Sequence, residues 1–286
     1  MAASPTAPST SPAAVGGRPS SDALPRRPLA LVTGASMGIG EEIARVLAER
    51  GHDVVLTARS EDRLHTLASE LEVLGATTHV LPLDLASEGA VDRLVAWLGE
   101  QGLEIDVLVN NAGFGTHGPT LEADPARERA MLQLLVQVPV DLSRALVPGM
   151  RARGSGRLLQ VASTASFQPC PGYALYAACK AALLSWSNAL HHELRGTGVT
   201  CTTLCPGPTA TAFLATAGHR PSGLQRATMM SARRVAELGV RGMERGRPTV
   251  VAGLFNRLGA LLATRLPRSW ATATAASMLR NRRAEG

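Results

Sequence analysis

The sequence predicts an α/β fold, a single Rossmann-type doubly wound parallel sheet with helices on both faces. Two observations predict it. From residue 29 onward, short apolar segments alternate with longer ones in which apolar side chains recur every three or four residues, as in successive βα units. The first apolar segment ends in a glycine-rich turn that leads directly into the first helical segment. Most of the 286 residues therefore belong to one large domain.

The strands are expected to be short and buried on both faces, as parallel strands are, and about seven of them are expected. We predict strands at residues 29–32, 53–58, 77–83, 106–110, 157–162, 199–204 and 249–251, each of which is a short apolar run. We predict helices at residues 41–50, 60–74, 87–100, 125–153 and 173–195, where the apolar spacing is helical.

Composition divides the chain into three segments. Residues 1–28 are rich in Ala, Ser, Pro and Thr, and because they have so little to bury we expect them to be disordered. The N-terminus has no apolar block, which argues against a secretory signal. Residues 29–254 form the predicted Rossmann-type domain. Residues 255–286 are predicted to form a basic, amphipathic extension of two short helices separated at Pro267.

The net charge of +6 comes from the last quarter of the chain, where residues 220–286 carry thirteen arginines against three glutamates. This asymmetry is poor support for a nucleic-acid surface on the main domain, and no nucleic-acid partner is expected. We expect the extension to pack on the protein, where it can cover the substrate cleft, or on a second subunit; contact with an anionic membrane surface is the alternative. No apolar run is long enough to span a bilayer, so we expect a cytoplasmic protein.

The four cysteines lack CxxC spacing and nearby histidines, which predicts reduced, mostly buried thiols and no metal site. His191, His192 and Glu193 lie late in a predicted helix without a third ligand, and we interpret them as a solvated face. We interpret His117 as a histidine of a surface loop.

The turn at residues 33–40 reads TGASMGIG. Its three glycines let the backbone turn sharply and approach a pyrophosphate, while the N-terminus of the following helix presents unpaired N–H groups and a positive dipole end. The second strand follows closely, as a dinucleotide site requires. The turn therefore predicts that the chain binds a dinucleotide.

The end of the second strand indicates which dinucleotide is bound. A carboxylate there would bind the ribose 2′-hydroxyl of NADH and repel a 2′-phosphate. This strand instead ends in Ala58 and Arg59, whose guanidinium suits a phosphate. The sequence therefore favours NADPH; the alternative is that Arg59 is a solvated loop residue.

Tyr176 and Lys180 lie four residues apart on one face of a predicted helix. Lys180 is the one lysine among 29 basic residues, and Tyr176 is one of two tyrosines. A nearby ammonium favours the phenolate, which would lower the pKa of the tyrosine. Ser163 follows the fifth predicted strand, at the sheet edge where open α/β sheets bind ligands.

Together these motifs resemble the short-chain dehydrogenase/reductase family, over about residues 29–254. The resemblance rests on the turn at 33–40, the NNAG segment at 110–113, the set Ser163, Tyr176 and Lys180, and the PGxxxT segment at 206–211. The chain is most similar to the broad bacterial group of NADP-linked members without an assigned substrate.

The resemblance implies the roles of these residues. Tyr176 would donate a proton to the substrate oxygen, Ser163 would hold that oxygen, and Lys180 would bind the nicotinamide ribose and lower the tyrosine pKa. The residues expected around NADPH are Gly34, Ser36, Met37, Gly38, Ile39, Gly40, Arg59, Asp84, Leu85, Asn110, Ala112, Gly113, Tyr176, Lys180, Pro206, Gly207, Thr209 and Thr211.

Two positions depart from the family pattern. Met37 stands where many NADPH-preferring members have Lys or Arg, which leaves Arg59 to hold the 2′-phosphate nearly alone. Leu135 stands where the family has an asparagine that marks a helix irregularity with a free carbonyl. Pro139 has no N–H to bond the Leu135 carbonyl, so it can leave that carbonyl free. The alternative is that Pro139 is an incidental kink.

The predicted substrate side of the nicotinamide is largely apolar, which favours a neutral, fairly hydrophobic ketone or aldehyde. The residues expected there are Phe114, Thr164, Phe167, Tyr173 and Phe213. We therefore predict a reversible NADPH-dependent carbonyl reductase, with a homodimer or homotetramer as its assembly. The alternatives are an NADP-binding sensor or scaffold with little redox activity, and a cyclase or isomerase on the same fold.

Overall fold

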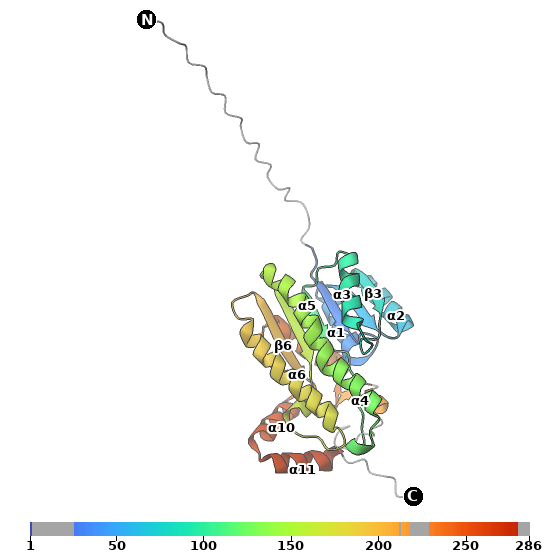
Figure 1. Ribbon diagram of the computed structural model, residues 1–286, viewed down its shortest axis with the longest axis vertical. Helices are drawn as coiled ribbons and strands as arrows, with labels where there is room; N and C mark the ends of the chain where they lie inside the picture. The colour runs from blue at the N-terminus through green and yellow to red at the C-terminus, as the bar shows by residue number, and fades with distance from the viewer. Residues whose placement is uncertain (2–25, 212, 218–228, 280–286) are drawn as a thin grey trace.

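The computed structural model describes residue 1 and residues 26–211, 213–217 and 229–279. Most of the N-terminal segment that we expect to be disordered lies outside the described residues. Seven parallel strands form one sheet, as the sequence predicts, and their order is β3-β2-β1-β4-β5-β6-β9. Figure 1 shows the strands together with the helices around them. The strands are β1 (Leu29–Thr33), β2 (Asp53–Ala58), β3 (Thr78–Pro82), β4 (Val107–Asn110), β5 (Gly156–Val161), β6 (Val199–Cys205) and β9 (Thr249–Val251).

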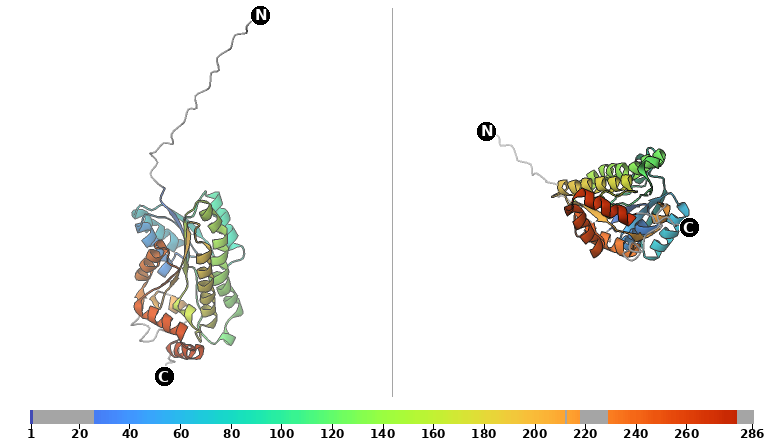
Figure 2. Two further views of the ribbon diagram at one scale, coloured as in Figure 1. Left: turned by 90° about the vertical axis from the view of Figure 1, so that its left-hand side faces the viewer. Right: turned by 90° about the horizontal axis from the view of Figure 1, so that it is seen from below.

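Helices cover both faces of this sheet; the left-hand view in Figure 2 shows the strands between two layers of helices. The strand residues alternate between two cores: Ala30 and Val32 face one, Leu29 and Leu31 the other. On the first face lie α1 (Gly38–Glu49), α2 (Glu61–Val73) and α9 (Ala232–Glu244). On the second lie α3 (Ala90–Glu100), α5 (Val138–Ala152) and α6 (Ala174–Glu193). The order of the strands reverses between β1 and β4, which places the ligand site at their carboxyl ends.

The helix predicted at residues 125–153 is interrupted near Pro139, where the sequence predicts an irregularity. It consists of α4 (Pro125–Leu132), one π-helical turn, η2 (Gln133–Gln137), and α5. By length and composition alone this span could cross a membrane. Its side chains Leu142 and Met150 are fully buried against the sheet, as in the core helix of a soluble α/β domain. Short 3-10 turns, η1 (Thr120–Glu122) and η3 (Thr164–Phe167), flank the region.

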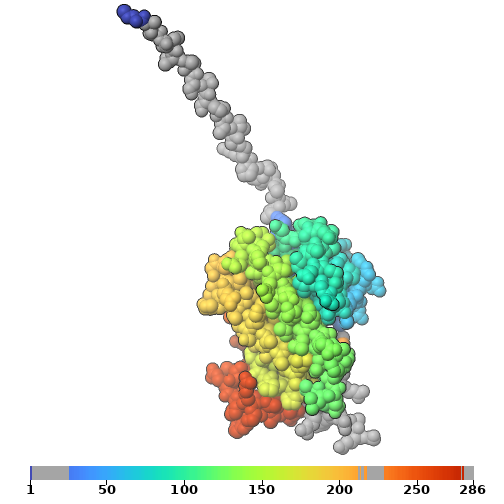
Figure 3. All heavy atoms as spheres, viewed as in Figure 1, coloured from blue at the N-terminus to red at the C-terminus, as the bar shows by residue number. Residues whose placement is uncertain are grey.

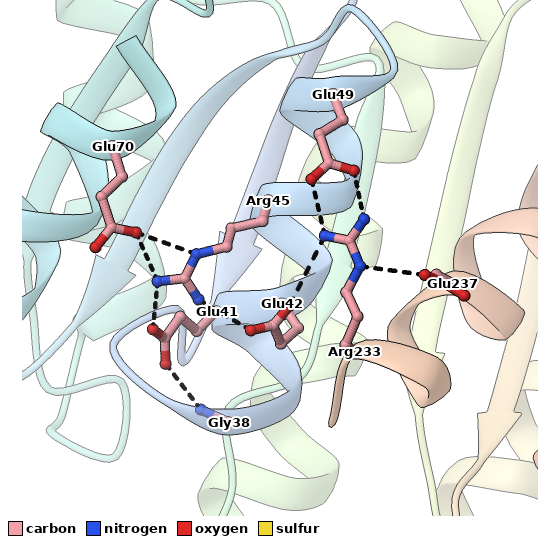
Figure 4. Close-up of polar contacts among 8 residues, drawn as sticks. All are labelled: Gly38, Glu41, Glu42, Arg45, Glu49, Glu70, Arg233 and Glu237. Atoms are coloured by element: carbon pink, nitrogen blue, oxygen red, sulfur yellow. Dashed lines mark hydrogen bonds and ion pairs between the residues drawn. The ribbon is translucent and has the colours of Figure 1, made fainter. Parts of the chain in front are cut away.

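Helix α9 is not among the helices predicted from the sequence, although Ser231 caps it by accepting a hydrogen bond from the Arg234 N–H. Two short segments also unpredicted, β7 (Thr209–Ala210) and β8 (Met230–Ser231), pair in parallel just before it, and α7 (Phe213–Thr216) follows β7. Arg233 anchors α9 to α1 by a bidentate pair with Glu49 at 2.5 and 2.9 Å (Figure 4).

The C-terminal extension consists of α10 (Leu254–Arg265) and α11 (Arg268–Leu279), on either side of Pro267. Both helices lie at the lower end of the molecule in Figures 1 and 3. They contact the domain through small side chains, since Ala260, Ala271 and Ala275 are buried. The large apolar side chains of α10 are exposed instead, so the expectation that the extension packs on its own protein holds only for its small-residue face.

Candidate active site

A cavity of about 2010 Å³ opens at the carboxyl ends of β1 to β6. Its floor comes from the loops that follow these strands, and its outer wall comes from α10 and α11. Among the residues expected around a dinucleotide, the following line it: Gly34, Ser36, Met37, Gly38, Ile39, Arg59, Asp84, Leu85, Ala112, Gly113, Tyr176, Lys180, Pro206, Gly207, Thr209 and Thr211. The cavity therefore lies where the order of the strands predicts a ligand site.

The glycine turn is packed directly against the end of β4. Gly34 has φ +66°, and a Cβ there would lie 2.8 Å from the Ala112 Cα. The Asn111 side chain donates hydrogen bonds to the carbonyls of Thr33 (2.9 Å) and Gly34 (3.1 Å). Gly40 does not line the cavity, because it lies beneath the turn, where a Cβ would collide with Asn111. The bare backbone of the turn thus faces the cavity, as contact with a pyrophosphate requires.

The predicted role of Asn110 beside the cofactor stays a prediction. Its side chain is buried, does not line the cavity and donates toward the carbonyl of Pro139 at 3.4 Å. Its neighbour Asn111 is the residue that lines the cavity and braces the glycine turn. The two asparagines differ because successive side chains at a strand end point to opposite sides.

Arg59 lies at the rim of the cavity with its side chain exposed. Within the described part of the chain no carboxylate forms an ion pair with it, although Arg45 on the adjacent helix α1 pairs with Glu41 and Glu70. An unpaired guanidinium beside Ser60 and Met37 suits the phosphate on an adenosine ribose. These residues therefore fit a dinucleotide that carries a 2′-phosphate.

Lys180 and Tyr176 both project from α6 toward the end of β5. The Lys180 Nζ is buried and donates a hydrogen bond to the Val161 carbonyl at 2.6 Å; it lies 5.9 Å from the centre of the Tyr176 ring. Ser163 caps η3, where its Oγ accepts from the Ala165 N–H at 3.1 Å. All three predicted residues line the same cavity.

Burial dominates the protonation of this group. It raises the pKa of Tyr176 to about 12, while a hydrogen bond with Ser163 acts in the opposite direction. Burial also lowers the pKa of Lys180 to about 8. The pKa of Tyr176 is therefore raised where the sequence predicts a lowered one, because desolvation of the phenolate is the dominant cause. The phenol of Tyr176 keeps its proton at neutral pH.

The π-helical turn lies beside these residues. Leu135 is buried within it and packs with Met131 and Cys179. Its Cδ2 would be 2.5 Å from a Cβ on Gly113, and that same Cβ would be 3.9 Å from the Lys180 Nζ. Only glycine at residue 113 therefore leaves room for Leu135 beside Lys180. The irregular helix occurs where the sequence predicts one, immediately before Pro139.

Aromatic side chains form the opposite end of the cavity. The Tyr176 ring lies 5.4 Å from the Phe213 ring and 6.0 Å from the Tyr173 ring. Phe114 and Tyr176 both pack against the core cluster that contains Leu135. Tyr173, Phe114, Phe213 and Thr164 line the cavity, as predicted for a substrate side. Phe167 does not line the cavity; it is partly buried and packs against the core cluster that contains Leu183, so its place on the substrate side stays a prediction.

The outer wall of the cavity includes residues beyond those predicted one by one. These additional cavity-lining residues include Arg127, Leu134, Cys170, Phe255, Asn256, Leu262, Leu266, Ala271 and Leu279. The amphipathic pattern of the C-terminal extension predicts that its helices can cover the substrate cleft, and residues of both α10 and α11 line this cavity. Asn256 differs from the apolar residues of α10 because its side chain is polar. It packs so closely on Gly207 that a Cβ on residue 207 would collide with the Asn256 amide.

The remaining polar residues have structural contacts. The His117 ring packs against the Tyr173 ring, with 4.9 Å between the ring centres. The sequence predicts a solvated face at His191, but the Nδ1 of His191 lies 2.7 Å from the Cys201 carbonyl and the side chain is only partly exposed. All four cysteines are buried and free, as predicted. No group of three potential metal ligands occurs among residues 26–211, 213–217 and 229–279.

Comparisons with known proteins agree with this site. The family model described as short chain dehydrogenase matches residues 28–221. The NADP-dependent 3-hydroxy acid dehydrogenase YdfG of Salmonella typhi is 37% identical over 180 residues, which cover 63% of this chain and 71% of YdfG. The ketoacyl reductase HetN of a Nostoc species is 34% identical over 177 residues, and the match spans only 62% of the length of HetN.

Two solved structures are similar over nearly the whole described chain. A short-chain dehydrogenase from Sphingobium yanoikuyae, in complex with NADPH, is 28% identical with a TM-score of 0.74, covering 90% of this chain and 98% of that one. The bulky-bulky ketone specific alcohol dehydrogenase from Comamonas testosteroni is 27% identical with a TM-score of 0.71, covering 90% and 96%.

Proposed function

Because the chain belongs to the short-chain dehydrogenase/reductase family, we propose that it uses NADPH to reduce a neutral, hydrophobic ketone or aldehyde to an alcohol, and catalyses the reverse reaction. The observation that carries this proposal is the position of Tyr176. It stands between the buried Lys180 and an aromatic wall, in a cavity that also exposes a glycine turn. The relatives and solved neighbours with NADP or NADPH in their names support the choice of cofactor.

Different residues of this chain would bind different parts of NADPH. The glycine turn and the N-terminus of α1 would hold the pyrophosphate, and Arg59 the 2′-phosphate. Lys180 would orient the nicotinamide ribose from its fixed position on the Val161 carbonyl. Bound NADPH supplies the hydride that reduces the carbonyl carbon.

Tyr176 supplies the proton. Its raised pKa keeps the phenol protonated at neutral pH, so it can donate to the oxygen that gains negative charge as the carbonyl is reduced. The Ser163 hydroxyl, on the adjacent strand end, would hold the same oxygen. In the oxidative direction the high pKa disfavours the phenolate, so alcohol oxidation should require a higher pH than ketone reduction.

The aromatic wall favours a bulky, apolar substrate. Phe114, Tyr173 and Phe213 surround the space beside Tyr176, and Leu262 and Leu266 of α10 extend the apolar surface outward. A cavity of about 2010 Å³ accommodates a dinucleotide and leaves room for a large carbonyl compound. The solved alcohol dehydrogenase that is specific for bulky-bulky ketones supports the same substrate class.

Tyr176→Phe tests the proposal. The variant keeps the ring that packs on Phe213 but loses the phenolic proton, so it should bind NADPH normally and lose turnover. NADPH oxidation should be measured against ketones and aldehydes of increasing size, with NADPH binding followed by fluorescence. Turnover retained by the variant would place the proton donor elsewhere. Wild-type protein that binds NADPH but reduces none of these compounds would favour the sensor or scaffold.

One observation favours a second candidate, a substrate that carries a carboxylate. Arg127 lines the cavity, with its guanidinium 5.4 Å from the centre of the Phe114 ring. YdfG, which is named for 3-hydroxy acids, supports this candidate. Arg127→Met should raise the KM for 3-hydroxy acids and leave the KM for neutral ketones unchanged if the carboxylate binds there. An equal KM effect on both classes would reject this candidate.

A further inference from the structure

The outer face of α10 is apolar and exposed. We define it by Leu254, Phe255, Leu258, Leu261 and Leu262, which recur with the spacing of one helical face. Leu254 is 78% exposed, Phe255 82% and Leu258 55%. Monomeric soluble proteins rarely expose a continuous apolar surface of this kind without a partner for it.

The opposite face of α10 is the one that contacts the protein. Ala260 is buried there and Asn256 donates to the Ala252 carbonyl at 2.6 Å. The orientation of α10 is thus fixed by its small and polar side chains. The large apolar ones lie on its exposed side, with Phe255 and Leu262 at the border with the cavity. Trp270, 66% exposed on the neighbouring helix α11, adds a further aromatic side chain that the fold leaves uncovered.

The charge around this face has one sign. Residues 245–284 contain eight arginines and no aspartate or glutamate. Arg257 and Arg265 lie on α10 itself and Arg268 begins α11, all three with exposed side chains. An apolar face with Phe, Leu and Trp that is flanked by arginines has the composition of a helix that lies in the plane of a membrane surface.

We propose that the outer face of α10, together with Trp270, docks on the surface of an anionic lipid bilayer. The apolar side chains would enter the boundary between headgroups and acyl chains, and the arginines would pair with lipid phosphates. This proposal goes beyond the proposed function and does not depend on it, since binding to lipid can be measured without a substrate.

Charge argues against a second copy of the chain as the occupant. A two-fold interface centred on α10 would bring Arg257 and Arg265 close to their own counterparts. Nor does the rest of the chain offer a cover: residues 2–25, 218–228 and 280–286 contain no apolar stripe of comparable length. An anionic surface, by contrast, complements both the apolar and the basic character of this face.

The position of the face gives docking a consequence for the site. Phe255 belongs both to the outer face and to the wall of the cavity, and Leu262 does too. On a docked protein the cavity would therefore open beside the lipid, where apolar carbonyl compounds concentrate. A membrane-bound protein would meet such substrates without their passage through water.

Co-sedimentation with vesicles tests the proposal. The full-length protein should bind vesicles of phosphatidylcholine mixed with phosphatidylglycerol, bind pure phosphatidylcholine about tenfold less, and lose much of the difference in high salt. Trp270 emission should shift to shorter wavelength with the anionic vesicles, and Trp270→Phe should abolish this shift.

The double variant Leu258→Glu/Leu261→Glu should lose binding to anionic vesicles, because it places carboxylates on the outer face while leaving the cavity wall intact. The matched control is Val73→Glu/Leu121→Glu, which makes the same charge change at two exposed apolar residues elsewhere, and it should bind as the wild type does. Thermal midpoints and sedimentation velocity show that each variant is folded and in which oligomeric state.

Three results would overturn the proposal. The first is a wild-type protein that does not bind anionic vesicles at low salt. The second is an equal loss of binding by the control variant. The third is an oligomer of the wild type that dissociates in the variant Leu258→Glu/Leu261→Glu, while neither the wild type nor the variants bind vesicles. That result would assign the outer face to contact with a second copy of the chain.

Discussion

The Nζ of Lys180 donates a 2.6 Å hydrogen bond to the main-chain carbonyl of Val161, the last residue of β5. Ser163 follows two residues later, so a single strand end fixes the ammonium and presents the hydroxyl that faces Tyr176. The lysine side chain is almost wholly buried. Desolvation of the Lys180 ammonium therefore lowers the stability of the folded state, and the same burial holds the ammonium beside Tyr176.

The pH dependence of the free energy of unfolding should measure this destabilisation by the buried ammonium. Burial lowers the pKa of Lys180 to about 8 from 10.5, so between these pH values the unfolded chain binds more protons than the folded one. The stability of the wild type should accordingly rise with pH over this window, relative to Lys180→Met, which has no ammonium to desolvate. Urea unfolding at pH 7 and pH 9.5 should show a relative gain of roughly 1–2 kcal/mol for the wild type.

The variant also controls for Tyr176, since both proteins keep this phenol and its contribution cancels. A stability difference that is the same at both pH values would show that Lys180 is not desolvated as the structure indicates. Lys180→Met should bind NADPH more weakly and lose turnover at either pH.

Arg59 should determine the choice between the two nicotinamide cofactors. Arg59→Ala removes an exposed charge-assisted bond to the 2′-phosphate, and the Kd for NADPH should rise by about tenfold while that for NADH stays unchanged. Titration of both cofactors by fluorescence measures this. Arg63→Ala is the matched control, because Arg63 is exposed on α2 but does not line the cavity. Equal losses for NADPH and NADH would refute the role of Arg59.

Local spacing predicted what the chain does within one helix or one turn. The four-residue interval between Tyr176 and Lys180 and the glycines at residues 34 and 38 both occupy the predicted places. Spacing could not decide between Asn110 and Asn111, because the choice depends on where the strand ends and thus on which side each residue points. The place of Phe167 likewise depends on the 3-10 turn η3 that it ends, and there its side chain is partly buried against a core cluster.

Properties that depend on tertiary contacts were beyond the sequence. The proximity of Lys180 predicted a lowered pKa for Tyr176, but burial decides the direction, and burial follows from the packing of the whole cavity. The same holds for α10 and α11, whose amphipathic pattern shows an apolar face but not which partner it contacts. Helix α9 had a local signal in the cap at Ser231 that the analysis overlooked.

Arg233 should stabilise the contact between α9 and α1. It pairs with Glu49 and Glu237, and Figure 4 shows Glu42 close to the same guanidinium. Arg233→Met should lower the stability by about 1 kcal/mol, a modest amount because the side chain is partly exposed, and high salt should reduce the difference. Thermal unfolding measures both effects. Arg234→Met, which removes only one exposed pair with Glu237, should have a smaller effect, and an equal one would contradict the network.

Pro139 should maintain the π-helical turn beside the catalytic residues. A regular α-helix would bond the carbonyl of Leu135 to the N–H of residue 139, and proline has none. The structure instead bonds the Val138 N–H to the Gln133 carbonyl, five residues back. The Pro139 carbonyl accepts from Ser143 at 2.6 Å and from Asn110 at 3.4 Å, which ties the irregular turn to β4.

Pro139→Ala should therefore let the helix become regular, occupy the Leu135 carbonyl and lower kcat, while the Kd for NADPH is unchanged. Pro148→Ala is the matched control: it removes a second proline from the same helix at an exposed site away from the cavity, and it should leave kcat unaltered. An ordered water between the Leu135 carbonyl and Lys180 in a crystal structure would identify the group that the carbonyl holds. Equal kcat values for both proline variants would show that the irregular turn has no part in the reaction.

Leu135→Asn distinguishes the role of the Leu135 side chain from the role of its main-chain carbonyl. Leu135 is buried against Met131 and Cys179, so an amide there should lower the thermal midpoint by leaving a polar group among apolar neighbours. Its main-chain carbonyl stays in the same turn, before the same proline, and turnover measured below the midpoint should be retained. A variant that is stable but has lost turnover would mean that the Leu135 side chain, packed against Gly113 near Lys180, positions the lysine itself.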